Sequence, residues 1–237
     1  MGLMTTFADR NDLRNALDAF YGSLKLRLDQ FEAERYKLDR SEATRFSVFD
    51  YIDPDENALS RVLSDLLDPT GKHGQGTVFL MTFLEMIGVP SEAIRPPLRV
   101  KREDPTLYSD NFGRRIDITL KVGDLGIGIE NKPWAEEGEH QLKDYMVHLR
   151  RKYGDRYVLV YLSGDGSAPV SLGNADLAAM EAAGTLKTLA YPTHVHAWLE
   201  RCCEDCKAER VRWFLRDLIQ FVESKFELVE LSEETNR

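Results

Sequence analysis

Cysteine is scarce in this sequence and confined to one place. The 237 residues include three cysteines, Cys202, Cys203 and Cys206. An odd set packed into five positions cannot form the spaced framework of a disulfide-stapled secreted domain, so the sequence excludes that class. A reducing compartment fits this pattern, and we expect a cytoplasmic protein.

Long apolar runs are missing as well. No run approaches the about 18 to 20 residues that a bilayer crossing needs, and the start, MGLMTTFADRND, turns polar before a signal-peptide core could form. The composition is that of a globular protein, with 43% hydrophobic and 30% charged residues. The length suits a single domain with a substantial core, and we expect one domain over residues 1–237.

The chain also lacks a net positive charge. It carries 31 Lys and Arg against 40 Asp and Glu, a net charge of -9, which disfavours a nonspecific polyanion binder. Between Arg95 and Arg156, however, 13 basic residues stand against 11 acidic ones, and the rest of the chain has a net charge of -11. Because phosphate contacts depend on where Lys and Arg lie, a nucleic-acid partner is compatible with this composition.

The cysteines lie just after two histidines. His194, His196, Cys203 and Cys206 have side chains that could bind zinc. The surrounding stretch, THVHAWLERCCEDCKAE, has the pattern of a helix in which cysteine is a small apolar filler. We favour the helix over the zinc site.

Apolar residues spaced by three and four predict a long amphipathic helix over residues 9–38. They are Leu13, Leu17, Phe20, Leu24, Leu28 and Phe31. Such a stripe needs a surface to pack on. That surface is either the core of the same chain, which we favour, or a second subunit in a homodimer.

The rest of the sequence alternates between helical and strand periods. After an extended piece at residues 45–52, helices are predicted over 56–67, 78–87, 137–152, 175–183 and, at the C-terminal end, 193–228. Strands are predicted over 98–103, 114–122, 125–130, 157–162 and 186–191. The turn at Gly123-Asp124 makes the second and third strands an antiparallel hairpin.

This hairpin carries the polar residues of chemical interest. In GRRIDITLKV, alternation places Ile116, Ile118 and Leu120 on one face and Asp117 on the other. In LGIGIENKPW, Ile127 and Ile129 face one way, and Gly126, Gly128, Glu130 and Lys132 face the other. Two glycines on one face indicate close approach of a backbone or a ligand. Pairing of the strands brings Asp117 near Glu130.

Two carboxylates and a backbone carbonyl are oxygen ligands suited to Mg²⁺. Hydrolysis of a phosphodiester needs a deprotonated water and stabilisation of negative charge, which a divalent ion supplies while a lysine orients the water. The set Asp117, Glu130 and Lys132 could serve this chemistry. The alternative is a routine Asp117–Lys132 salt bridge on an exposed sheet face.

The order of several short motifs is more specific than E-x-K alone. Asp117 is followed by Glu130-Asn131-Lys132 and then by Gln141-Leu142-Lys143-Asp144-Tyr145. Upstream lie Phe46 to Phe49, Glu56, Leu66-Leu67-Asp68-Pro69, His73-Gly74-Gln75-Gly76 and Phe79 to Leu84. This series resembles the PD-(D/E)xK nuclease superfamily, in particular a prokaryotic subfamily with a Q-x-x-x-Y motif. In this sequence Ile116 replaces the motif's proline, and Asn131 stands where an apolar residue is usual, so we expect Asn131 to face a polar neighbour.

The resemblance implies an α/β fold, a restriction-endonuclease-like α/β/α core at about residues 46–191 with a mixed sheet, flanked by N- and C-terminal helices. It implies that Asp117, Glu130 and the Asn131 carbonyl bind Mg²⁺ or Mn²⁺, that Glu56 reaches the metal directly or through water, and that Lys132 positions or activates the water. It further implies that Gln141 and Tyr145 brace the site and contact the substrate backbone.

Four further positions carry open alternatives. His73 contacts phosphate or structures its loop. Arg115 and Lys143 are expected to bind substrate phosphates, although charges on a strand edge also serve solubility. Trp134, just past Lys132, either stacks on a base or is a buried anchor.

The function that follows is a metal-dependent nuclease that hydrolyses phosphodiester bonds, with DNA as the expected substrate, in a prokaryotic defence, mobile-element or repair setting. The alternative is a nuclease-fold protein that binds nucleic acid or a partner without cleaving it. Intact clustered carboxylates favour the nuclease, since a retired site has no need of them.

Overall fold

The computed structural model describes residues 7–43, 46–107, 113–134, 138 and 140–226, with the backbone alone for 7–12. Contacts divide the chain into two compact units, Met1–Phe46 and Ser47–Arg237, which we describe separately. The prediction of one domain over the whole chain therefore stays a prediction. None of the helices in the described ranges combines the length and the apolar content that a membrane span needs.

The helix α1 (Phe7–Glu42) makes up nearly all of the described part of the first unit and confirms the helix predicted at residues 9–38. Its predicted stripe from Leu13 to Phe31 is exposed, because one helix has no second surface on which to bury a stripe. What covers this stripe stays a prediction.

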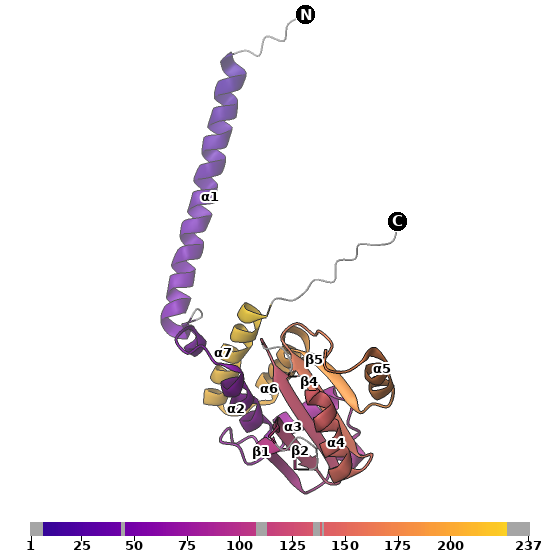
Figure 1. Cartoon of the computed structure of the whole chain (residues 1–237). Helices are drawn as coiled ribbons and strands as arrows, with labels where there is room; N and C mark the ends of the chain where they lie inside the picture. The colour runs from indigo at the N-terminus through magenta and orange to yellow at the C-terminus, as the bar shows by residue number, and fades with distance from the viewer. Residues whose placement is uncertain (1–6, 44–45, 108–112, 135–137, 139, 227–237) are drawn as a thin grey trace, which may run out of the picture. The chain divides into compact units, whose positions relative to one another are not determined.

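The second unit contains the sheet and the other helices (Figure 1). Its strands are β1 (Leu98–Pro105), β2 (Arg115–Val122), β3 (Leu125–Lys132), β4 (Tyr157–Ser163) and β5 (Leu186–Ala190). Its helices are α2 (Glu56–Leu67), α3 (Val78–Met86), α4 (Gln141–Tyr153), α5 (Asn174–Ala182), α6 (His196–Asp205) and α7 (Glu209–Lys225). The predicted helix start at 137 is too early, because the described residues Gly138 and His140 are not helical and α4 begins at Gln141. Residue 137 itself and the predicted end at 228 lie outside the described ranges.

Two segments differ from the sequence prediction. The piece predicted as extended contains a short 3-10 turn at Val48–Asp50, because the Ser47 hydroxyl accepts a hydrogen bond from Phe49 N and caps it. The segment Tyr191–Val195 forms a π-helical turn that leads into α6.

The sheet is mixed and has the order β1-β2-β3-β4-β5. β1, β2 and β3 are antiparallel neighbours, and β3, β4 and β5 are parallel. The two-residue turn pairs Val122 with Leu125, so the predicted hairpin is confirmed and lies at the centre of the sheet.

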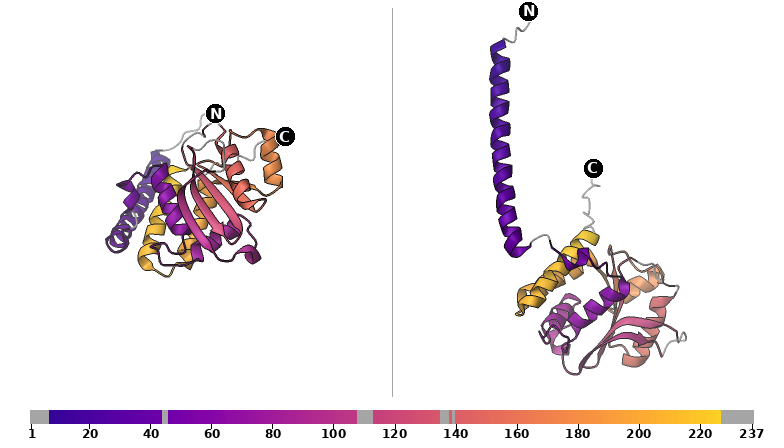
Figure 2. Two further views of the ribbon diagram at one scale, coloured as in Figure 1. Left: turned by 60° about the horizontal axis from the view of Figure 1, so that its bottom comes forward. Right: turned by 90° about the vertical axis from the view of Figure 1, so that its left-hand side faces the viewer.

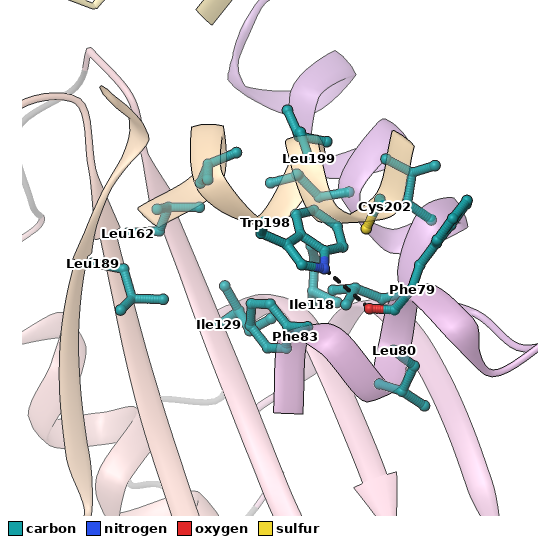
Figure 3. Close-up of a cluster of buried hydrophobic side chains, with 14 of the residues drawn as sticks. Phe79, Leu80, Phe83, Ile118, Ile129, Leu162, Leu189, Trp198, Leu199 and Cys202 are labelled. Carbon is teal, nitrogen blue, oxygen red and sulfur yellow. Dashed lines mark hydrogen bonds between the residues drawn. The ribbon is translucent and has the colours of Figure 1, made fainter. Parts of the chain in front are cut away.

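Helices cover both faces of the sheet, which confirms the α/β/α architecture (Figure 2). On one face, α2, α3, α6 and α7 pack on Ile118, Leu120, Ile127 and Ile129. At the centre of this core, the buried Trp198 donates its indole N–H to the carbonyl of Phe79 at 3.0 Å (Figure 3). The large apolar layer on this side fixes the position of α2, which carries Glu56.

Helices α4 and α5 cover the other face. Here Leu142, Tyr145 and Leu149 of α4 form a second cluster that includes Ile116. The prediction that Ile116 shares a face with Ile118 is therefore wrong. The β2–β3 ladder ends at the pair Ile118–Ile129, while β1 still pairs with Ile116 and Arg115, so Ile116 packs on α4 beyond the last β2–β3 pair.

The two glycines of β3 have a packing reason. A Cβ on Gly126 would lie 2.2 Å from a ring carbon of Tyr153, and one on Gly128 would lie 3.0 Å from Leu149. The close approach expected from these glycines is thus made by side chains of α4, and not by a ligand or a second backbone. The glycines let α4 lie close to β3 and bring Gln141 toward Glu130.

The histidines and cysteines near α6 are not gathered around one point. His194 Nδ1 accepts from Ala190 N, whereas His196 lies between Glu200 and Glu223. The Cys203 thiol donates to the Arg212 carbonyl at 3.9 Å and the Cys206 thiol to the Ala208 carbonyl at 3.5 Å, so both thiols have backbone partners of their own. Within the described ranges no three His, Cys, Asp or Glu side chains form a metal-binding group. The helical reading of this stretch is the one that the packing supports.

Candidate active site

The site lies at the end of the central hairpin, beyond its last ladder pair. Since Ile118 pairs with Ile129, the adjoining residues Asp117 and Glu130 come opposite each other. The backbone N–H of Asn131 donates to Asp117 Oδ2 at 2.8 Å and fixes the Asp117 carboxylate at the edge of β3. The structure thus brings the two predicted acids together.

Glu130 is the most buried of these groups, with 0% exposure. Its Oε1 accepts from Lys132 Nζ at 3.0 Å and from Gln141 Nε2 at 2.5 Å. Its Oε2 is also buried but has no hydrogen-bond partner among the described residues. A buried carboxylate oxygen without a partner is costly, and such a group calls for an explanation.

Both acids have raised pKa values. Burial, and then the neighbouring charge of Asp117, raise the pKa of Glu130 well above its usual range. Burial also raises the pKa of Asp117, and the hydrogen bond from Asn131 and the charge of Lys132 do not cancel this effect. The protein therefore keeps two carboxylates close together where their charges are unfavourable, a condition that a bound cation relieves.

Lys132 lies between two carboxylates. Its ammonium group is 2.7 Å from Glu56 Oε1 and 3.0 Å from Glu130 Oε1. Burial lowers the pKa of Lys132, but the charges of Glu130 and Glu56 outweigh burial and hold that pKa above its ordinary value. Lys132 is therefore a positively charged hydrogen-bond donor in this site. It is not on an exposed sheet face and it does not pair with Asp117 in the routine salt bridge considered above.

Glu56 reaches the site from the first turn of α2. Asp55 caps this helix by accepting a hydrogen bond from Ala58 N at 2.7 Å, and the acidic first turn suits the helix dipole. From this position the Glu56 carboxylate contacts the Lys132 ammonium and is its second acidic partner, after Glu130.

Asn131 joins three elements through its side chain and is fully buried. Its Nδ2 donates to Ser60 Oγ at 2.9 Å, and its Oδ1 accepts from the Tyr191 hydroxyl at 2.8 Å. The expected polar neighbour of Asn131 is therefore present. The sequence prediction missed Ser60 and Tyr191 themselves. Ser60 had one available signal, since it lies one turn after Glu56 on the same helix.

Gln141 and Tyr145 form a chain of hydrogen bonds behind Glu130. Gln141 Nε2 contacts the Tyr145 hydroxyl at 2.8 Å, and that hydroxyl donates to the carbonyl of Arg115 at 2.5 Å. Tyr145 is 1% exposed. The pair is positioned to brace Glu130 and the start of β2, whereas contact of Tyr145 with substrate stays a prediction.

Two predicted phosphate contacts are accessible. The Arg115 side chain is 63% exposed, and its ion pair with Glu103 is long at 3.6 Å. The Lys143 side chain is 44% exposed and lies 3.5 Å from Asp176. Exposed ion pairs of this kind contribute little to stability, so neither residue is needed to hold the fold.

His73 serves its own loop. Its Nδ1 accepts from Gln75 N at 3.0 Å, its Nε2 lies 2.9 Å from the Asp68 carbonyl, and its ring packs on Phe79. With 6% exposure, the residue has the contacts of the loop-structuring alternative. A contact of His73 with phosphate stays a prediction.

The oxygen donors around Glu130 suit a divalent ion that keeps part of its water shell. Glu56, Asp117 and Glu130 do not make a ready three-carboxylate group in the described part of the chain. Magnesium, however, usually binds through one or two carboxylates and keeps several waters. Asp117, the unpartnered Oε2 of Glu130 and the Asn131 carbonyl match that requirement in chemical type. The residues fit a magnesium-like ion.

Comparison with known proteins gives one finding of family membership. The model of the PD-(D/E)XK nuclease superfamily matches residues 46–219. No curated protein and no solved structure matches the chain significantly. The matched range covers well over half of the chain and contains every site residue from Glu56 to Tyr191. The resemblance that the motif order indicated is confirmed, and the chain belongs to the PD-(D/E)XK nuclease superfamily.

Proposed function

We propose that this protein is a divalent-metal-dependent nuclease that hydrolyses phosphodiester bonds, with DNA as substrate. Membership in the superfamily supports a phosphodiesterase. The observation that carries the proposal is the buried Glu130 carboxylate, which has one unpartnered oxygen and adjoins Asp117 and Lys132.

Asp117, Glu130 and the Asn131 carbonyl would hold the Mg²⁺ or Mn²⁺ ion, with Glu56 beside them. When bound, such an ion neutralises developing negative charge and lowers the pKa of a water molecule. Gln141 holds Glu130 Oε1 in place, and Tyr145 holds Gln141. This bracing keeps the carboxylate oriented before substrate arrives, which is where preorganised sites gain their rate.

Lys132 supplies a fixed positive charge. The charges of Glu130 and Glu56 hold its pKa above the ordinary value, which favours the protonated form over the neutral amine of a general base. It instead donates hydrogen bonds, by which it orients the attacking water or stabilises charge on the phosphate. Arg115 and Lys143 lie at exposed positions and would bind flanking phosphates, a role in which they add affinity without sequence preference.

The test is cleavage of plasmid and oligonucleotide DNA with Mg²⁺ or Mn²⁺. We expect the wild type to cleave and the variants Asp117→Ala and Lys132→Ala to lose about 100-fold or more in rate, the typical cost of removing one such group. The control is Lys121→Ala, because Lys121 is exposed at the opposite end of β2. Equal activity in the wild type and all three variants would remove the assignment.

A protein that binds nucleic acid or a partner without cleaving is the second candidate. The observation in its favour is that the Lys132 ammonium already forms ion pairs with both Glu56 and Glu130. Calorimetric titration with Mn²⁺ separates the two. The nuclease should bind Mn²⁺ in a manner that Glu130→Gln abolishes, whereas a binding protein should show no metal binding that depends on Asp117 or Glu130.

A further inference from the structure

Three aromatic rings form a stacked row next to the site. The rings of Trp134 and Phe226 lie 5.6 Å apart with an interplanar angle of 19°, and those of Phe226 and Tyr191 lie 4.5 Å apart at 22°. The Tyr191 hydroxyl donates to Asn131 Oδ1. The row therefore connects Trp134 to the buried Asn131 side chain.

The position of Trp134 is fixed from two sides. The preceding Pro133 is buried, and its carbonyl would lie 2.2 Å from a Cβ on Gly164, so only glycine permits this contact. Phe226 is 5% exposed and supports one face of the indole. Trp134 itself is 50% exposed. It is neither the buried anchor that the sequence allowed nor a freely rotating surface residue, but a supported ring with half of its surface in solvent.

We propose that Trp134 stacks on an unpaired base next to the scissile phosphate, so that the substrate is single-stranded at the position of cleavage. This inference rests on the proposed nuclease function. Trp134 follows Lys132 by two residues, at most about 7 Å along the chain. A base next to the reacting phosphate is therefore within range of the indole.

The preference for an unpaired base follows from the geometry of nucleic acids. Bases inside a duplex are stacked on their neighbours, so an aromatic side chain can meet a base face only in a single strand or after the base has left the helix. A supported ring loses little conformational entropy when a base stacks on it. Stacking is tolerant of sequence, so this contact selects strand structure and not base identity.

The experiment compares full-length wild type, Trp134→Ala and Trp134→Phe in binding labelled single-stranded DNA and the same sequence as duplex, with a chelator present so that no cleavage occurs. The control is Trp213→Ala, because Trp213 on α7 is 40% exposed and its loss removes an indole elsewhere. We expect Trp134→Ala to bind the single strand about 5- to 100-fold more weakly and to bind duplex nearly as well as wild type. Trp134→Phe should keep most of the affinity, and Trp213→Ala all of it.

The outcomes separate this inference from the proposed function. Unchanged single-strand binding by Trp134→Ala, or equal losses on single strand and duplex, overturns the inference. A change of oligomeric state in light scattering on Trp134→Ala would identify a protein contact, which also overturns it.

In one outcome the wild type cleaves with Mg²⁺ while Trp134→Ala keeps the same ratio of single-strand to duplex cleavage rates. That result would overturn the stacking inference and leave the proposed nuclease function intact. A wild type that neither binds nor cleaves either DNA defeats the nuclease function as well. Trp134→Phe preserves the ring row, so it controls for misfolding of Trp134→Ala.

Discussion

Two buried carboxylates of this protein, Asp104 and Glu130, differ in how far neighbouring groups compensate their charge. Asp104 on β1 is 4% exposed, and both of its oxygens have partners: Oδ1 lies 2.5 Å from Lys101 Nζ, and Oδ2 lies 3.2 Å from Lys152 Nζ. Although burial raises its pKa, hydrogen bonds and charges from Lys101 and Lys152 lower that pKa below its ordinary value. Glu130 has an unpartnered oxygen and a raised pKa.

The difference separates a carboxylate that the protein alone compensates from one that the proposed function assigns to metal binding. Asp104 is compensated by the protein alone, whereas Glu130 stands next to a second acid and remains incompletely compensated. Incomplete compensation lowers stability and is retained where a ligand completes it. The comparison predicts that changes at these two residues separate stability from activity.

The largest effect is expected at Glu130. Glu130→Gln keeps the size of the side chain but removes the charge, and we expect cleavage to fall by about 1,000-fold. The free energy of unfolding should rise by about 1 kcal/mol, because burial of the Glu130 charge, and then its repulsion with Asp117, outweigh its attraction to Lys132. Cleavage kinetics and urea denaturation measure the two quantities. A clear loss of stability in this variant would mean that Glu130 is a structural residue like Asp104.

Asp104→Asn should have the opposite profile. It leaves two lysines without their partner, but the Lys101 and Lys152 side chains are 60% and 34% exposed, so the cost is below that of a fully buried pair. We expect a loss of about 2 kcal/mol in the free energy of unfolding. Cleavage, assayed well below the melting temperature, should be unchanged. A reduced cleavage rate in a fully folded sample would show that Asp104 contributes to the active site.

The pH dependence of the stability tests whether Asp104 stabilises the fold through its charge. Since its pKa is lower in the folded protein than the ordinary 3.8, its charge stabilises the fold at higher pH, and that stability is lost as pH falls through the folded pKa. The stability difference between wild type and Asp104→Asn should therefore be full at neutral pH and shrink below about pH 4. Denaturation at several pH values measures this difference. A difference independent of pH would show that lost packing, and not charge, explains the variant.

Tyr191→Phe tests how far the hydrogen bond from Tyr191 to Asn131 supports the site. Tyr191 belongs to the core on the face of the sheet opposite α4. It removes the hydrogen bond to Asn131 Oδ1 and keeps the stacking on Phe226. We expect a loss of about 1 to 2 kcal/mol in the free energy of unfolding, the cost of one buried acceptor without a donor. The cleavage rate should fall much less than in Glu130→Gln. A loss as large as that of Glu130→Gln would place Tyr191 in the reaction itself.

The smallest effect is expected at Arg115. Arg115→Ala should weaken DNA binding and reduce the slope of log affinity against log salt by about 1, as expected for one phosphate contact. Stability should not change, because the side chain is exposed. Arg156→Ala is the matched control, since Arg156 is as exposed and pairs with Asp124 at the opposite end of β3. An equal change of slope in both variants would show a general effect of charge.

Much of the core architecture could be predicted from local sequence. The Gly123-Asp124 turn fixes the register of the hairpin, and that register places Asp117 opposite Glu130 without further information. The order of the motifs then identified the family and its α/β/α core. The prediction failed where neighbours decide the outcome, as at Ile116, which packs on α4 after the β2–β3 ladder ends.

The sequence by itself determined which groups are chemically available, because strand alternation and a two-residue turn are local properties of the chain. Only the tertiary structure decided how each group is compensated. Lys152 reaches Asp104 across 48 residues, and Tyr191 reaches Asn131 across 60. Whether a buried carboxylate is satisfied depends on such distant partners, and no spacing in the sequence encodes them, since they meet only when helices pack on the sheet.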